Sequence, residues 1–260
     1  MSERVNITDI LCIGCQKGST SWLHSVLNRH PDTHAFPNSR PVTSTNKEAH
    51  FWDWNHDRGV EWYRTLMTPK EPHKKSMDFT PEYAFLPDRH IAECKRLSPQ
   101  ARVIYILRDP LARAVSALRM HLLWRFGKDH DQPLRLDDLF FELVKKARLD
   151  QHGGFARNHA AWRRHYDDIL LLNYEDFHND RAGSVARVFA HTGLDTARMS
   201  DEDRAKLDDI MGKRVWESEK FPIERDALMF LHGYTWRTRQ AVEKAFGMTF
   251  SEGLELLDGG

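Results

Sequence analysis

The chain has 260 residues, which is enough for one α/β domain with a substantial core and too few for two domains of ordinary size. Its 38 basic and 38 acidic side chains balance, so no overall charge attracts nucleic acid or an anionic membrane, and any basic site must be local. No apolar run reaches the roughly 18 residues of a membrane span, and residues 1–9 lack a hydrophobic signal core. We therefore expect a single cytoplasmic domain over residues 1–260, without a nucleic-acid partner or a membrane span, and its oligomeric state stays open.

The most informative segment begins with the apolar run Ile10–Ile13, which predicts a short buried strand. A turn follows over residues 14–21, and an amphipathic helix begins beside Trp22. Gly18 allows close backbone approach, the N–H groups at the helix start are unsatisfied, and Lys17 supplies a positive charge. Hydroxyl groups that can bind an anionic oxygen come from Ser19, Thr20 and Ser21. The segment predicts a phosphate-binding loop between a strand and a helix.

The cysteines are too few for a disulfide scaffold, which fits a reducing compartment. Cys12 and Cys15 have the C-x-x-C spacing of some redox and zinc sites. Cys12, however, falls in the predicted strand, and neither a second C-x-x-C nor a nearby histidine pair completes a metal site. We expect both thiols to be structural and predict no metal.

The rest of the chain alternates short strand-like runs with helical patterns, which predicts a parallel sheet covered on both faces. The further strands are expected at Thr33–Phe36, Lys74–Phe79, Arg102–Leu107 and Ile169–Leu172. Asp109 and Pro110 supply an N-cap and a first-turn proline for a helix after the fourth strand. Later helices are expected at Leu136–Leu149, Phe155–Tyr166, Ala182–Thr192 and Glu224–Phe246, the last interrupted at His232–Gly233. The expected fold is a P-loop-type three-layer α/β/α architecture with a central, mainly parallel sheet of about five strands and a largely helical C-terminal half.

The segment Pro37–Asn46 is the sole long irregular stretch, rich in Pro, Ser, Thr and Asn. A loop of this length beside a ligand-binding loop is either a lid over the site or an ordered surface loop. The sequence leaves both alternatives open.

The order of residues in the predicted loop separates it from common nucleotide-binding motifs. A Walker loop has its lysine directly after the second glycine, whereas Lys17 precedes Gly18, and no acidic strand end is evident to hold magnesium. The G-x-G-x-x-G pattern of dinucleotide sites is absent as well. These differences disfavour an ATP-dependent P-loop kinase and favour a ligand with fewer consecutive phosphates.

A second candidate anion site follows the strand Arg102–Leu107. Arg108 lies at the expected carboxyl edge of the sheet, and Ser116 comes about two helical turns later. A guanidinium fork and a hydroxyl can bind a separate phosphate. The alternative is that Arg108 pairs with Asp109 or another carboxylate and that Ser116 is only a small helix residue.

Together, these segments resemble the sulfotransferases that use 3′-phosphoadenosine 5′-phosphosulfate (PAPS). Residues 17–21 resemble their 5′-phosphosulfate loop, residues 104–116 resemble their 3′-phosphate motif, and Lys47–Trp54 resembles the E-x-H-F-F-D segment of the glycosaminoglycan branch. The heparan sulfate 3-O-sulfotransferases have the most similar pattern, with the motifs in the same order over most of the chain. The resemblance implies PAPS as co-substrate, 3′-phosphoadenosine 5′-phosphate (PAP) as co-product, and no metal.

The resemblance also assigns roles to individual residues. Lys17 is expected to neutralise charge on the leaving phosphate, Glu48 to take the acceptor proton, and His50 to assist Glu48. Without the resemblance, Glu48 is more simply a carboxylate paired with Lys47, and His50 a satisfied buried histidine. The residues expected to bind the donor, with Trp22 beside the adenine, are Lys17, Gly18, Ser19, Thr20, Ser21, Trp22, Arg108 and Ser116.

The acceptor is expected to be a hydroxyl, less readily an amine, of a carbohydrate or small molecule. Phe79 stands where the 3-O-sulfotransferases carry a lysine that helps to bind an acidic polysaccharide, which disfavours a heparan-like acceptor. Two alternative functions are an ATP-dependent P-loop kinase and a catalytically inactive nucleotide-binding regulatory domain. The presence of Glu48 and Lys17 argues against the inactive domain.

Overall fold

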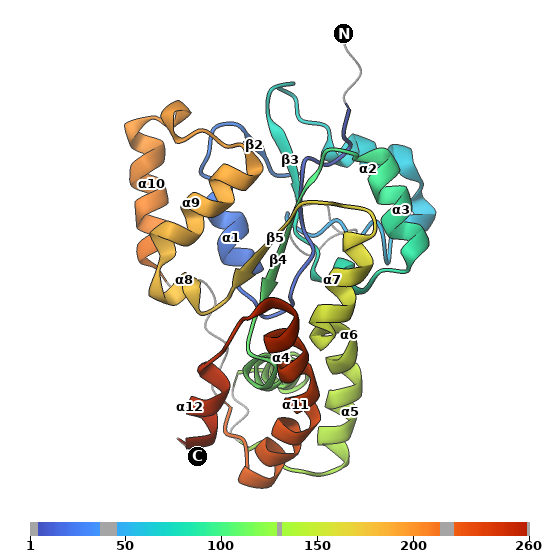
Figure 1. The fold of residues 1–260 in the computed structure, drawn as a ribbon, viewed down its shortest axis with the longest axis vertical. Coiled ribbons are helices and arrows are strands. Elements are labelled where there is room, and N and C mark those ends of the chain that lie inside the picture. Colours follow the sequence, from blue (N-terminus) through green and yellow to red (C-terminus); the bar gives the residue numbers. More distant parts are fainter. Residues whose placement is uncertain (1–4, 37–45, 129–131, 214–220, 259–260) are drawn as a thin grey trace.

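Five parallel strands form the centre of the fold in the computed structural model, which describes residues 5–36, 46–128, 132–213 and 221–258 (Figure 1). Their order across the sheet is β2-β3-β1-β4-β5. The apolar runs form strands because helices cover both faces of the sheet and remove their side chains from water. The strands are β1 (Ile10–Cys12), β2 (Thr33–His34), β3 (Lys75–Asp78), β4 (Arg102–Leu107) and β5 (Ile169–Asn173). The predicted five-stranded parallel sheet is confirmed.

Side chains that alternate along β1 divide the core into two layers. Ile10 and Cys12 belong to the apolar cluster on one face of the sheet, and Leu11 belongs to the cluster on the other. Helices pack on both clusters, as Figure 1 shows, so the predicted α/β/α layering is confirmed. The first face carries α1 (Thr20–Leu27), α9 (Arg181–Thr192) and α10 (Asp201–Gly212), and the second carries α2 (Val60–Met67), α3 (Asp88–Leu97) and α7 (Phe155–Arg163).

A helical lobe extends beyond the carboxyl ends of the strands (Figure 1). Its central helix, α4, begins as predicted, because Asp109 Oδ1 accepts a hydrogen bond from the Ala112 amide at 2.9 Å and Pro110 occupies the first turn. The lobe consists of α4 (Pro110–Phe126), α5 (Asp138–Lys146), α6 (Leu149–Gly153), α11 (Arg225–Phe246) and α12 (Glu252–Asp258). The short helices elsewhere in the described chain are η1 (His56–Arg58), η2 (Pro81–Phe85), α8 (Asp176–Asn179) and η3 (Thr196–Arg198).

Two helix predictions were wrong. Helix α11 runs without interruption through Gly233, because one interior glycine costs only about 1 kcal/mol and the buried Leu231 packs into the apolar cluster shared with α4. The helix expected over Leu136–Leu149 forms as α5 but stops early, at Lys146, because Arg148 has a left-handed backbone conformation with φ of 46°, and α6 begins at Leu149. The local sequence pattern predicts that a segment is helical. It does not predict the residues at which tertiary packing continues or ends the helix.

The segment Pro37–Asn46 lies outside the described residues except for Asn46. The lid and the surface loop therefore both stay predictions from the sequence. Within the described ranges, every helix is too short or too polar to cross a lipid bilayer.

Candidate active site

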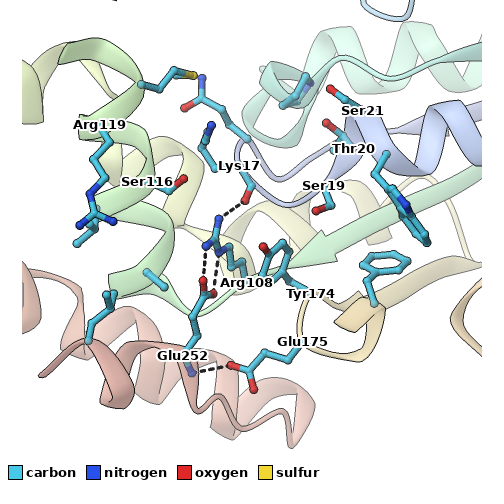
Figure 2. A pocket seen from close by; sticks show the side chains of 18 of the residues that line it. Lys17, Ser19, Thr20, Ser21, Arg108, Ser116, Arg119, Tyr174, Glu175 and Glu252 are labelled. Atoms are coloured by element: carbon cyan, nitrogen blue, oxygen red, sulfur yellow. Dashed lines mark hydrogen bonds and ion pairs between the residues drawn. The ribbon is translucent and has the colours of Figure 1, made fainter. Parts of the chain in front are cut away.

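A cleft of about 790 Å³ lies at the carboxyl ends of the central strands (Figure 2). This is the edge at which parallel α/β sheets bind ligands, and the volume is in the range of small-molecule sites. The loop after β1, the start of α4, the segment after β5 and the start of α12 all contribute to its wall. Predicted site residues that line it are Lys17, Ser19, Thr20, Ser21, Trp22, Glu48, Arg108 and Ser116. Segments far apart in the sequence thus reach a common cleft.

The loop after β1 is held against β4 by backbone hydrogen bonds. The Cys15 amide donates to the Ile106 carbonyl at 2.9 Å, which continues the parallel pairing beyond the end of β1. The Gly18 amide donates to the Cys15 carbonyl at 3.0 Å and closes a turn. Lys17 and Ser19 have left-handed backbone conformations, with φ of 67° and 64°. The loop is therefore fixed in shape, and the start of α1 faces the cleft.

The cysteine thiols near this loop are buried and free. Burial raises the pKa of Cys12 to about 12 and that of Cys15 to about 11, so both thiols are neutral at physiological pH. Neutral, enclosed thiols are poor nucleophiles and poor metal ligands, which agrees with the structural role predicted for them.

Lys17 is the cation of the loop, and its ammonium group loses its proton more easily than that of an ordinary lysine. Burial, together with the nearby charge of Arg108, lowers the pKa of the Lys17 ammonium to about 8. An anion bound beside Lys17 would stabilise the charged form and restore a higher pKa. The loop is thus prepared for an anionic ligand.

Arg108 directly follows β4, and its guanidinium is largely buried and hydrogen-bonded to neighbouring groups. Its Nε donates to Glu252 Oε2 at 2.8 Å, its second terminal nitrogen also pairs with the Glu252 carboxylate, and its first donates to the Lys17 carbonyl at 2.7 Å. The guanidinium carbon lies 4.2 Å from the ring centroid of Tyr174. The alternative in which Arg108 pairs with a carboxylate therefore holds here, but the partner is Glu252 rather than Asp109.

Glu48 lines the cleft and forms an ion pair with Lys47. Burial acts to raise the pKa of Glu48, but the charge of Lys47 and hydrogen bonds from His50 and Lys47 outweigh it and lower that pKa to about 2. The carboxylate is ionised at physiological pH and can accept a proton, although this stabilisation makes it a weak base in the resting state.

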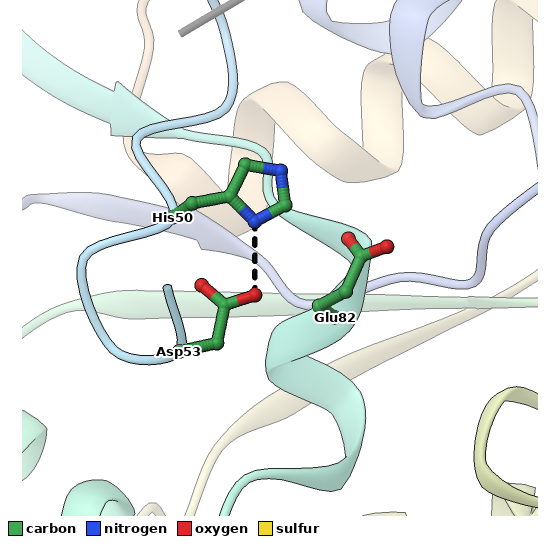
Figure 3. A group of neighbouring side chains, drawn as sticks. All are labelled: His50, Asp53 and Glu82. Carbon is green, nitrogen blue, oxygen red and sulfur yellow. Dashed lines mark hydrogen bonds and ion pairs between the residues drawn. The ribbon is translucent and has the colours of Figure 1, made fainter. Parts of the chain in front are cut away.

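His50 lies among carboxylates, two of which, Asp53 and Glu82, are drawn with it in Figure 3. Its Nδ1 is 2.9 Å from Asp53 Oδ2, its Nε2 is 3.6 Å from Glu48 Oε2, and Glu82 is close by. Burial acts to lower the pKa of His50, but the hydrogen bonds to Asp53 and Glu48 prevail and raise it to about 10. The imidazole is therefore protonated at physiological pH and is a cation held among carboxylates. His50 thus lies close to Glu48, and its backbone there has a left-handed φ of 51°.

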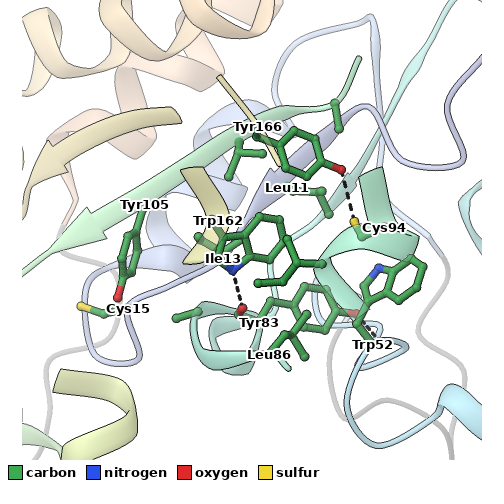
Figure 4. Packing of buried hydrophobic residues seen from close by; sticks show 14 of the residues in the cluster. Leu11, Ile13, Cys15, Trp52, Tyr83, Leu86, Cys94, Tyr105, Trp162 and Tyr166 are labelled. Carbon is green, nitrogen blue, oxygen red and sulfur yellow. Dashed lines mark hydrogen bonds between the residues drawn. The ribbon is translucent and has the colours of Figure 1, made fainter. Parts of the chain in front are cut away.

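A buried hydrogen-bond network positions the segment that carries Glu48. The Ala49 amide donates to Asp78 Oδ1 at 3.2 Å, and the Phe51 amide donates to the Tyr83 hydroxyl at 2.7 Å. The Tyr83 hydroxyl in turn donates to Asp78 Oδ2 at 2.9 Å, and its carbonyl accepts from Trp162 Nε1 at 2.9 Å (Figure 4). The expectation that no strand has an acidic end was wrong, because β3 ends at Asp78, but this carboxylate is fully buried and its oxygens accept the hydrogen bonds of this network.

Two other predicted positions lie mainly in the core. Trp22 lines the cleft with a small exposed part, while its ring packs edge-on against Phe177, with centroids 5.1 Å apart. Its contact with adenine stays a prediction, restricted to that exposed edge. Phe79 is fully buried against the His24 ring and brings neither charge nor side-chain surface to the cleft.

Several cleft residues escaped the sequence reasoning. Glu252 is 144 positions from Arg108, and nothing local in the sequence marks it as a partner. Glu175 accepts hydrogen bonds from the Ser251 and Glu252 amides at 2.8 and 3.0 Å, which fixes the start of α12 in the cleft wall. Arg119 also lines the cleft, and its spacing of three from Ser116 on a predicted helix is a signal that was available.

The amino-acid sequence is similar to those of known proteins. A sequence model described as "sulfotransferase domain" matches residues 7–220. Human heparan sulfate glucosamine 3-O-sulfotransferase 3B1 is 30% identical over 192 residues, which cover 71% of this chain and 45% of that protein. Mouse heparan sulfate glucosamine 3-O-sulfotransferase 6 is 28% identical over 186 residues, covering 71% of this chain and 52% of that protein. The chain thus spans about half the length of these relatives.

Solved structures show the same fold. A sulfotransferase from Alicyclobacillus acidocaldarius superimposes with a TM-score of 0.67 at 18% identity, covering 95% of this chain and 98% of that chain. Sulfotransferase STF9 from Mycobacterium avium superimposes with a TM-score of 0.55 at 13% identity, covering 95% and 79%. At these identities the likeness shows the fold alone.

Proposed function

The chain belongs to the sulfotransferase domain family, and from that membership we propose that it transfers a sulfuryl group from PAPS to a hydroxyl of a carbohydrate or small-molecule acceptor. The observation that carries the proposal is that Lys17, Arg108 and Glu48 reach a common cleft from three separate segments. They supply a cation for the phosphosulfate, a guanidinium beside the second phosphate position, and an ionised carboxylate. Loop 17–21 fits the donor because the start of α1 and the Lys17 ammonium both favour an anion.

The transfer requires one bond to form and one to break at sulfur. The acceptor oxygen attacks the sulfuryl sulfur, the bond from sulfur to the 5′-phosphate oxygen breaks, and its electron pair stays on that oxygen. Lys17 neutralises the charge that develops on the phosphate, and Glu48 accepts the proton of the acceptor hydroxyl. The products are the sulfated acceptor and PAP, and the protein contributes mainly position and charge.

Glu48 must exchange part of its resting contacts before it can act as a base. Its ion pair with Lys47 stabilises the carboxylate and lowers its affinity for a proton. An acceptor hydroxyl that binds Glu48 competes with Lys47, and the anionic donor attracts the same ammonium. We infer that both substrates together weaken the ion pair and raise the proton affinity of Glu48.

The acceptor side favours a neutral sugar or similar ring over a polyanion. Phe79 is buried and offers no cation, and the charges of Lys47 and His50 are already matched by Glu48 and Asp53. Trp54 stacks on His50 with ring centroids 3.7 Å apart and is 61% exposed. An exposed indole beside the base is a suitable platform for a sugar ring.

Donor binding should depend on pH through Lys17. The pKa of its ammonium is about 8 in the free protein, and a bound anion raises it, so the complex holds more protons than the free protein above that pH. We expect PAP affinity to be greatest below pH 8 and to fall as pH rises from 8 to 10. Calorimetry at pH 7, 8, 9 and 10 measures this, with Lys17→Met as the variant whose affinity should stay flat over that range. An unchanged wild-type affinity at pH 10 would contradict the assignment.

Binding and transfer assays distinguish the proposed function from its alternatives. Calorimetry should show tight binding of PAP without magnesium and weaker binding of ADP with or without it. Transfer from radiolabelled PAPS is then measured over neutral glycosides, desulfated polysaccharides, phenols and amines. A preference for ADP with magnesium would support a kinase, and PAP binding without transfer to any acceptor would support the inactive domain.

Arg108→Ala should weaken PAP binding by at least about 2 kcal/mol, or roughly 30-fold. The variant loses charge-assisted hydrogen bonds and leaves the Glu252 carboxylate without its partner, facing the donor. Calorimetry checks the prediction, with Arg102→Ala on the same strand as the control, because the exposed Arg102 pairs with Asp168 away from the cleft. Equal PAP affinity in Arg108→Ala and the wild type would refute the role of Arg108.

A further inference from the structure

The charge of Arg108 is already matched before a donor binds. The Glu252 carboxylate accepts hydrogen bonds from its Nε and one terminal nitrogen in a bidentate pair, and the Lys17 carbonyl accepts one from the other terminal nitrogen. A phosphate monoester carries between one and two negative charges at physiological pH. The Arg108–Glu252 pair is neutral overall, so it cannot by itself balance a 3′-phosphate.

Arg119 is a second guanidinium at the same end of the cleft. It follows Ser116 by three positions on α4, so both side chains lie on the same face of that helix. Both line the cleft, and in the view of Figure 2 the Ser116 hydroxyl lies between the side chains of Arg108 and Arg119.

The charge of Arg119 has no acidic partner among the described residues. Its Nε donates to the Phe221 carbonyl at 2.8 Å, and a neutral carbonyl leaves the positive charge unmatched. Burial, together with the charge of Arg108, acts to lower the pKa of Arg119. A cation that is partly desolvated and repelled by its neighbour gains most from an added anion. Its terminal nitrogens still carry four N–H donors.

We propose that Arg119 is a further binding residue for the 3′-phosphate of the donor, and that it supplies the positive charge that Glu252 removes from Arg108. Arg108 and Ser116 then orient the phosphate, while Arg119 balances its charge. The inference rests on the proposed function, since it concerns the same donor site. It also gives Glu252 a defined effect, because its carboxylate opposes binding of the phosphate.

The test compares two ligands that differ only in the 3′-phosphate, PAP and adenosine 5′-phosphate. Arg119→Ala should weaken PAP binding tenfold or more in calorimetry and change binding of adenosine 5′-phosphate less than twofold. Arg119→Lys, which keeps the charge, should recover a substantial part of the PAP affinity. Arg125→Ala is the matched control, because Arg125 lies on the same helix but pairs with Glu142 at the surface. Thermal unfolding of each variant shows whether the fold is retained.

The substitution of Glu252 tests the same inference with the opposite sign. Glu252→Gln keeps the shape of the side chain and removes its charge, so PAP affinity should rise severalfold while affinity for adenosine 5′-phosphate is unchanged. The inference is overturned if Arg119→Ala weakens the binding of both ligands equally, or of neither. Arg119 would then serve only as the hydrogen-bond donor to the Phe221 carbonyl. If Arg119→Ala fails to fold, reduced PAP affinity in Glu252→Gln overturns it instead. Failure of the wild type to prefer PAP over adenosine 5′-phosphate would overturn the proposed function as well.

Discussion

Glu48→Gln should lower the rate of sulfuryl transfer by about 10²- to 10⁴-fold, the usual contribution of a positioned general base. The amide keeps the size of the side chain but cannot take the acceptor proton. PAP affinity should not fall, because Glu48 repels rather than binds the anionic donor, and its loss frees Lys47. Single-turnover transfer from radiolabelled PAPS measures the chemical step, and calorimetry measures PAP affinity.

A matched acid-to-amide change separates this effect from a general loss of charge. Glu142→Gln alters an exposed carboxylate on α5 that pairs with Arg125 and Lys146, outside the cleft, and should leave transfer unchanged. Transfer by Glu48→Gln within a few-fold of the wild-type rate would remove Glu48 from the role of base.

Lys17→Met should reduce both transfer and donor binding, with the larger effect on transfer. Loss of a group that stabilises developing charge typically costs about 10²- to 10³-fold in rate. The Lys17 ammonium acts most strongly when the sulfur–oxygen bond breaks, because charge on the leaving phosphate is then greatest. Donor saturation curves give the turnover number and the donor KM separately.

Lys206→Met is the control for Lys17, since Lys206 pairs with Glu202 on the surface of α10. A Lys17→Met enzyme with a higher donor KM but an unchanged turnover number would show that Lys17 only binds the donor. The contribution of Lys17 to transition-state stabilisation would then be refuted.

The sheet and the loop between β1 and α1 were predictable because their signals are local. Buried parallel strands are short apolar runs, and the carboxyl ends of such strands meet at a common edge, which placed loop 17–21 beside Arg108 from sequence alone. The start of α4 was equally clear, because Asp109 and Pro110 act within one helical turn.

The missing parts of the site depend on contacts between distant segments. Glu252 reaches Arg108 from α12, and no local sequence pattern marks it as a partner. The raised pKa of His50 arises from Asp53 and Glu48 only after a left-handed turn brings the three side chains together. The uninterrupted α11 similarly depends on packing that outweighs the intrinsic cost of Gly233.

The hydrogen bond between the Ala49 amide and Asp78 ties the Glu48 segment to the central sheet. Asp78 ends β3, which pairs directly with β1, the strand that leads into the donor loop, and Leu11 on β1 faces Asp78 in register. The spacing between neighbouring strands, about 4.8 Å, is a property of backbone pairing and does not depend on side-chain identity. The distance between the Glu48 segment and the loop after β1 is thus set by the sheet, and under the proposed function the surface around Trp54 can vary with the acceptor while that distance is preserved.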